Sequence, residues 1–150
     1  MGDLRQFAVR MKLRGKRLGT EVNRIVRQVA LQIDQAVVLA TPVNTGFARS
    51  NWIVSLDVPV DHTHDPFSPI KKGMDPNKIN ESANAKGAID QGKQVIATRK
   101  LEQDVYITNN TSYIGKLNDG SSAQAPAQFV ETAIEVGSRT IRNAKVSTGP

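Results

Sequence analysis

The residue types that could bind a metal ion or transfer protons are concentrated in one short stretch, DHTHD, from Asp61 to Asp65. Its two histidines, His62 and His64, are the only histidines of the chain. On an extended backbone both rings would lie on one face between two carboxylates, and these groups are ligands for divalent metal ions. A proline-rich loop without a distant third ligand seldom preorganises a metal site. We therefore interpret the stretch as an exposed loop and assign no metal ligand.

The sequence contains few residues or motifs that indicate any other chemistry. The absence of cysteine excludes disulfides, thiolate metal sites and a thiol nucleophile. The phosphate-binding, dinucleotide-binding, zinc-protease and serine-hydrolase motifs do not occur. Any two of the fourteen acidic residues could still meet in the fold as a catalytic pair. Nothing positively indicates an enzyme, so we predict no catalytic residue and no cofactor.

The composition is that of one globular domain, residues 1–150. A chain of 150 residues fits a single core, and 39% hydrophobic with 23% charged residues is ordinary for a soluble protein. Aromatic residues make up only 5%, so we expect a core of Val, Ile, Leu and Ala. No apolar run approaches the roughly 18 residues of a membrane helix, and the N-terminus lacks the apolar centre of a signal peptide. We expect no membrane partner.

The excess positive charge lies at the N-terminal end of the chain. Residues 1–27 carry eight basic residues against Asp3 and Glu21, which gives +6, the formal net charge of the whole chain. The basic residues are Arg5, Arg10, Lys12, Arg14, Lys16, Arg17, Arg24 and Arg27. Such asymmetry favours an acidic partner, either nucleic acid or an acidic protein surface, and the alternative is a basic helix face in solvent.

Apolar residues recur every three or four positions from Leu4 to Ala40, which is typical of one helix face. Gly15 and Gly19 interrupt this pattern. We therefore predict a short basic helix hinged to a long helix from about Leu18 to Ala40, with residues 1–17 as a basic arm.

The stretch TPVNTGFARSNW, residues 41–52, predicts an abrupt reversal of the chain. Pro42 ends the long helix because it disfavours the helical conformation of Thr41, and Gly46 supplies the backbone freedom that the reversal needs. The apolar residues Trp52, Val54, Leu56 and Val58 then alternate as in a strand. We expect Trp52 to anchor the helix to the sheet.

The rest of the chain divides into a loop, a helix, a strand and a final helix. Residues 59–82 hold four of the seven prolines and predict a long exposed loop. We predict a helix from there to about Lys100, and a strand over 103–109 that could pair antiparallel with the first. Residues 113–126 are turn-rich, a third helix begins near Pro126 and runs to about Asn143, and 144–150 form a flexible tail.

Two stretches, read together, resemble a known family. TPVNTGFARSNW at the end of a long helix and the later YIGKLNDGSSAQAPAQFVETAI, residues 113–134, are similar in order and spacing to the tail-completion or neck proteins of long-tailed bacteriophages. The residues that carry the first motif are Thr41, Pro42, Val43, Thr45, Gly46, Arg49 and Trp52. Those that carry the second are Tyr113, Leu117, Gly120, Pro126, Phe129 and Ala133. Asn44 departs from the family pattern, which usually has Asp there.

The resemblance implies an α+β domain with a long N-terminal helix and further helices packed on a small antiparallel sheet. It also implies a structural virion protein, made in the host cytoplasm, that assembles into a six-fold ring at the head-tail junction and joins the tail to the DNA-filled head. Its partners would be further copies of itself, the adjacent neck, connector and tail proteins, and DNA in the lumen.

Three interpretations of function follow from these observations. In the first, Arg5, Arg10, Lys12, Arg14, Lys16 and Arg17 contact an acidic neighbour or DNA, and the loop at 59–82 makes contacts between subunits or rings. The second is a free basic nucleic-acid-binding protein, although no groove-reading motif is present. The third is a small hydrolase or metal protein that uses Asp61, His62 and His64. For Arg49 we expect a contact within its own subunit rather than with the next one.

Overall fold

The chain reverses direction at both ends of a long central helix, and the strands that flank this helix meet in one sheet. The computed structural model describes residues 7–11, 19–42, 46–68, 81–120 and 127–144. In chain order the elements are β1 (Phe7–Met11), α1 (Gly19–Ala40), α2 (Phe47–Ser50), β2 (Ile53–Leu56), α3 (Glu81–Ala97), β3 (Val105–Asn109), α4 (Ile114–Asn118) and α5 (Phe129–Asn143). The expected α+β class, with a long helix near the N-terminus and an antiparallel sheet, is confirmed.

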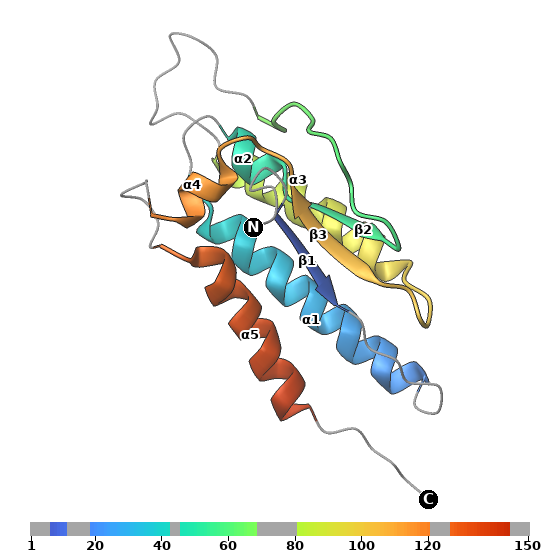
Figure 1. Cartoon of the computed structure of the whole chain (residues 1–150). Helices are drawn as coiled ribbons and strands as arrows, with labels where there is room; N and C mark the ends of the chain where they lie inside the picture. Colours follow the sequence, from blue (N-terminus) through green and yellow to red (C-terminus); the bar gives the residue numbers. More distant parts are fainter. Residues whose placement is uncertain (1–6, 12–18, 43–45, 69–80, 121–126, 145–150) are drawn as a thin grey trace, which may run out of the picture.

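The sheet has three strands in the order β1-β3-β2, and both pairs are antiparallel. In the backbone register, Ile107 of the central strand pairs with Val9 of β1 on one side and with Val54 of β2 on the other. Helix α1 contacts α5 and α3, and α3 also contacts β2. Figure 1 shows α5 along one side of α1, while α3 lies behind β2 and β3. Helix α1 is therefore the element against which α3 and α5 pack.

The core is aliphatic, as the composition predicts, and Trp52 is its largest member. Its largest fully buried apolar side chains are Val26, Val29, Val37, Val38, Trp52, Val54, Val105, Ile107, Ile114, Phe129 and Val130. Burying one such side chain stabilises the fold by about 1.5–3 kcal/mol before entropy is counted. The face of α1 identified by its three-and-four spacing supplies Val29, Ile33 and Val37 to this core, and Val26, Ala30 and Val38 outside that pattern are buried as well.

The N-terminal helix predicted before Gly15 is wrong within the described residues, because Phe7–Met11 forms strand β1. Phe7, Val9 and Met11 also alternate with a period of two, so the apolar pattern fits a strand as well as a helix. An isolated short helix is marginal in water, whereas pairing with β3 gives the backbone of this segment a ladder of hydrogen-bond partners. Arg10 therefore belongs to the sheet, and Arg5, Lys12, Arg14, Lys16 and Arg17 lie outside the described residues.

The boundaries of the other elements differ less from the predicted ones. The strand after Trp52 ends at Leu56 rather than Val58, because Asp57 adopts a left-handed conformation with φ 67°. The predicted loop is present over 59–68, but Glu81 and Ser82 belong to α3, and 69–80 lie outside the described residues. The helices ending near Lys100 and Asn143 and the strand at 103–109 are confirmed as α3, α5 and β3. The one-turn helix α4 was not predicted.

None of the described helices combines the length and apolarity that crossing a membrane requires. The tail predicted at 144–150 is described only at Ala144.

Candidate interaction surface

The first motif forms a junction between the end of α1, α2 and β2. Pro42 follows the last turn of α1, and the Thr41 hydroxyl donates to the carbonyl oxygen of Val37 at 2.5 Å. The same hydroxyl accepts the indole N–H of Trp52 at 2.7 Å. Thr41 and Trp52 are fully buried, so these bonds satisfy polar groups that water does not reach. Trp52 thus anchors the helix to the sheet, as expected from its position.

Arg49 binds within its own subunit, at the C-terminal end of α1. Its Nη2 donates to the carbonyl oxygens of Thr41 at 2.7 Å and Leu39 at 3.2 Å. The last carbonyls of a helix have no partner inside the helix and carry partial negative charge. The guanidinium therefore stabilises the end of α1, which confirms the expectation of an intrasubunit contact.

Gly46 adopts the left-handed conformation that the reversal was predicted to need, with φ 77°. A Cβ at this position would collide with the side-chain amide of Asn84, a buried residue of α3. Asn84 accepts from the Ser50 hydroxyl at 2.9 Å and from the Ser68 backbone N–H at 2.6 Å, and donates to the Ser68 carbonyl at 2.9 Å. The role of Asn84 was not predicted from the sequence. The available signal was its position, because Asn84 is a polar residue one helical turn before Ala88 on a helix face that is otherwise apolar.

The second motif forms the corner between α4 and α5. The backbone carbonyl of Asn118 accepts from Gln128 N at 2.5 Å, and its side-chain oxygen accepts from Val130 N at 3.0 Å. Its amide also donates to the Glu131 carboxylate. These bonds satisfy N–H groups in the first turn of α5 that no helix partner can reach. Asn118 is a second residue that the sequence did not single out.

The two motifs contribute to the same core. Ala48 and Trp52 from the first motif region are buried with Ile114, Phe129 and Ala133 from the second, and Tyr113 and Leu117 pack against this cluster. Gly120 has φ 92° at the turn after α4. Val43, Thr45 and Pro126 lie outside the described residues. The described motif residues therefore contribute mainly to the core and to the corners of the domain.

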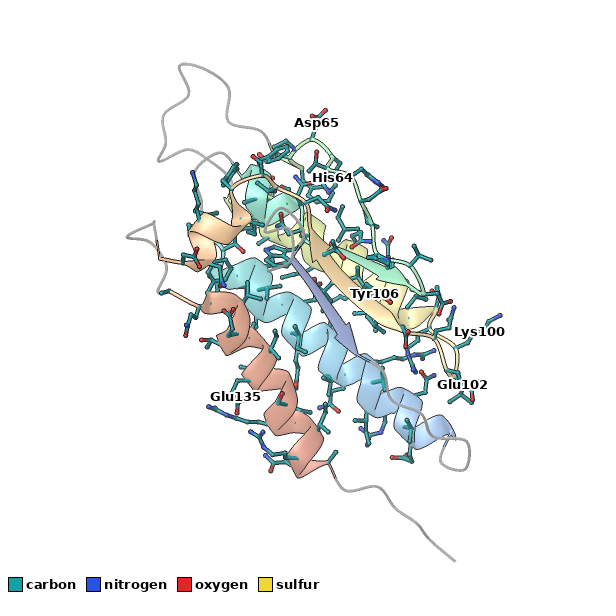
Figure 2. The ribbon with its side chains drawn as sticks, viewed as in Figure 1. His64, Asp65, Lys100, Glu102, Tyr106 and Glu135 are labelled. Carbon is teal, nitrogen blue, oxygen red and sulfur yellow. The ribbon has the colours of Figure 1, made fainter. Side chains whose placement is uncertain are left out.

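The DHTHD stretch is held against the body of the protein by two asparagines. Asn51 accepts from His64 N at 2.8 Å and donates to its carbonyl at 3.0 Å, and Asn110 donates to the Val60 carbonyl at 2.7 Å. Figure 2 shows His64 and Asp65 at the outer edge of the molecule. No three potential metal ligands gather anywhere in the described ranges.

Two of the N-terminal basic residues are engaged within α1 or with its neighbours. Arg24 is exposed and pairs with Glu21 at 3.2 Å. Arg27 donates to the Arg99 carbonyl at 2.6 Å, and Asn23 contacts Arg99 as well, so the turn after α3 is tied to α1. Burial and the charge of Arg27 lower the pKa of Arg99, while Asp104 and Asp57 raise it. Arg27 therefore has a structural contact that the charge count alone did not reveal.

An apolar groove lies on the surface between α1 and α5. Ala36 and Ala40 line one wall, and Phe129, Thr132, Ala133 and Val136 line the floor and the other wall, around a volume of about 220 Å³. Leu39, which is exposed, is three residues from Ala36 and so neighbours it on the helix surface. Below the groove the helices are close, since a Cβ at Gly137 would come within 2.5 Å of Ile33 Cδ1. Its lining is apolar, so it is suited to hold apolar side chains.

Comparisons with protein-family models, with curated proteins and with solved structures give no match. The functional assignment therefore depends on the motif residues and on the geometry of the surface.

Proposed function

We propose that this protein is a structural subunit of a bacteriophage virion that forms a ring at the head-tail junction and joins the tail to the DNA-filled head. The observation that supports it best is the joint position of the two motifs. Residues that are far apart in the chain, such as Trp52 and Phe129, share one buried cluster. A frame of this kind keeps the relative positions of α1, α5 and the sheet fixed, as a subunit that transmits force between two assemblies requires.

The surface of the domain is compatible with such a role. An apolar groove and several exposed large hydrophobic side chains are present on it. Large exposed apolar patches mark sites of contact with proteins, membranes or ligands. In this proposal the N-terminal residues Arg5, Arg10, Lys12, Arg14, Lys16 and Arg17 contact an acidic neighbour or the DNA that passes the joint.

The first test is the mass of the purified protein in solution, measured by light scattering at moderate salt and at several concentrations. We expect a particle of several 16.3 kDa subunits whose mass stops rising with concentration, since a closed ring has a fixed number of copies. The second test adds purified phage tails that lack their neck and measures co-sedimentation. A chain that stays monomeric and also fails to bind such tails would contradict the proposal.

A further inference from the structure

A buried carboxyl group lies where α1, α3 and β2 meet. Asp34 of α1 is fully buried, and within the described part of the chain neither of its carboxyl oxygens has a hydrogen-bond partner. Its carboxyl group occupies the space that a Cβ of Gly92 would fill, and Val54 Cγ2 lies 3.0 Å from where that Cβ would be. Helix α3 therefore approaches both elements this closely only because residue 92 has no side chain.

The residue before Gly92 closes the outer edge of the sheet. The Gln91 amide donates to the Val54 carbonyl at 2.9 Å, and the Gln91 side-chain oxygen accepts from Val54 N at 3.0 Å. Strand β2 is an edge strand, so these are backbone groups that a further strand would bind. A movement of α3 away from Asp34 at Gly92 would also withdraw Gln91 from Val54.

No positive charge lies close enough to compensate an ionised Asp34. Strand β2 contains no titratable residue. On α1 the next charged residue is Arg27, two turns away, and it is bonded to the Arg99 carbonyl. The charged residues of α3 are Glu81, about 16 Å along the helix from Gly92, the exposed pair Lys86 and Asp90, which bond at 3.2 Å, and the exposed Lys93. Burial raises the pKa of Asp34 to about 8, because a carboxylate is unstable in such surroundings.

We infer that Asp34 controls whether the edge of β2 is closed. The neutral carboxyl group stays between α1 and α3, and Gln91 remains bonded to Val54. The ionised group requires water, which enters when α3 moves away from α1 at Gly92, and this movement breaks the bonds of Gln91. Ionisation of Asp34 therefore frees backbone groups that can pair with another strand. The inference is independent of the proposed ring.

The direction of the effect follows from the pKa difference. Below about pH 4 the carboxyl group is neutral in the closed and the open form, so the closed form has its full stability. Between about pH 4 and pH 8 the closed form keeps a proton that the open form has lost, so opening becomes about tenfold more favourable per pH unit. Above about pH 8 both forms are ionised and the dependence ends.

Hydrogen exchange of the Val54 amide, followed by NMR between about pH 5 and pH 8, tests the inference. Protection factors are compared because they remove the intrinsic pH dependence of exchange. We expect the protection of Val54 to fall about tenfold per pH unit, and to be lower at every pH than that of Val29, a buried residue of α1. A local opening exposes little surface, so low concentrations of urea should speed exchange at Val29 but not at Val54.

Equal protection and an equal urea response at Val54 and Val29 would overturn the inference, since Val54 would then exchange only through global unfolding. Constant protection of Val54 across the pH range would overturn it as well. Both results come from the unmodified protein, so they decide the matter even if a variant fails to fold.

Two variants assign the effect to one carboxyl group. Asp34→Asn keeps the size of the side chain and removes its titration, so the protection of Val54 should no longer change with pH. The matched control is Asp90→Asn, which removes the carboxylate of the residue before Gln91 and should keep the full pH dependence. A fall in protection that persists in Asp34→Asn, or that disappears in Asp90→Asn, would show that Asp34 does not control the edge.

Discussion

Asp34 is the residue whose environment departs furthest from what its type prefers. It lies in the middle of α1, fully buried, and its carboxyl group packs against Gly92 of α3 and near Val54 of β2. Among the described residues neither carboxyl oxygen has a hydrogen-bond partner. Burial raises the pKa of Asp34 from 3.8 to about 8. A buried carboxyl without a positive partner is more stable as the neutral acid.

This pKa shift predicts how stability depends on pH. Between about pH 4 and pH 8 the folded chain holds a proton on Asp34 that the unfolded chain has lost, so the free energy of unfolding falls as pH rises through this window. Asp34→Asn removes the charge and keeps the size. We expect it to be more stable than the unmodified protein at pH 8, by an amount on the order of 5 kcal/mol at most, and nearly equal to it below pH 4. Urea unfolding at several pH values measures this.

The control for Asp34 is Asp65→Asn, since Asp65 is exposed in the segment after β2 (Figure 2). This change should leave the free energy of unfolding at pH 8 unaltered. If Asp34→Asn destabilises the protein equally at all pH values, the buried carboxyl has a packing role that does not depend on its ionisation.

At the scale of elements, the outer edge of β2 is closed by a side chain of α3. The Gln91 amide donates to the Val54 carbonyl at 2.9 Å, and its oxygen accepts from Val54 N at 3.0 Å. The side chain thus makes the pair of bonds that a further strand would make. An unpaired edge strand invites pairing with another chain, so Gln91 prevents growth of the sheet on this side.

Replacing Gln91 tests this protection. Gln91→Ala leaves the backbone groups of Val54 without partners, and we expect a loss of about 1–3 kcal/mol in unfolding free energy. The Val54 amide should exchange with solvent faster, and the protein should aggregate more readily on storage. Gln94→Ala, an exposed position on the same helix, is the control and should change neither property. Unchanged exchange at Val54 in Gln91→Ala would show that other groups close the edge.

At the scale of the whole molecule, the uneven charge predicts how the protein responds to salt. If several of the N-terminal basic side chains contact DNA, the logarithm of the binding constant should fall by about 0.7–0.9 per log unit of salt for each phosphate neutralised. Replacing Arg14, Lys16 and Arg17 with Gln removes up to about three phosphate contacts. The slope should become shallower by the amount that these contacts contribute. Band-shift assays over a range of salt concentrations measure it.

The matched control replaces Lys86 and Lys93, exposed residues of α3, with Gln. This control should leave the slope unchanged because these charges lie outside the basic N-terminal segment. A flat salt response in the unmodified protein would exclude DNA as the main partner and favour an acidic protein surface.

The sequence by itself determined those helices, strands and turns whose evidence lies in neighbouring residues. The apolar spacing of α1 and α5, the alternation around Val105 and Ile107, and the breaks at Pro42 and Gly46 are properties of short segments, and the structure confirms them. Aliphatic composition and the anchoring position of Trp52 were likewise predictable, because a helix end and a following strand can be read from neighbouring residues.

Only the tertiary structure decided what depends on partners distant in the chain. Phe7–Met11 is a strand because β3 is available to pair with it, and the same residues read locally fit a helix. The roles of Asn84 and Asn118 depend on Ser68 and Val130, to which no periodicity points. The groove between Ala36 and Val136 exists because packing brings α1 and α5 together. Local patterns specify the type of an element, whereas pairing and burial specify its neighbours.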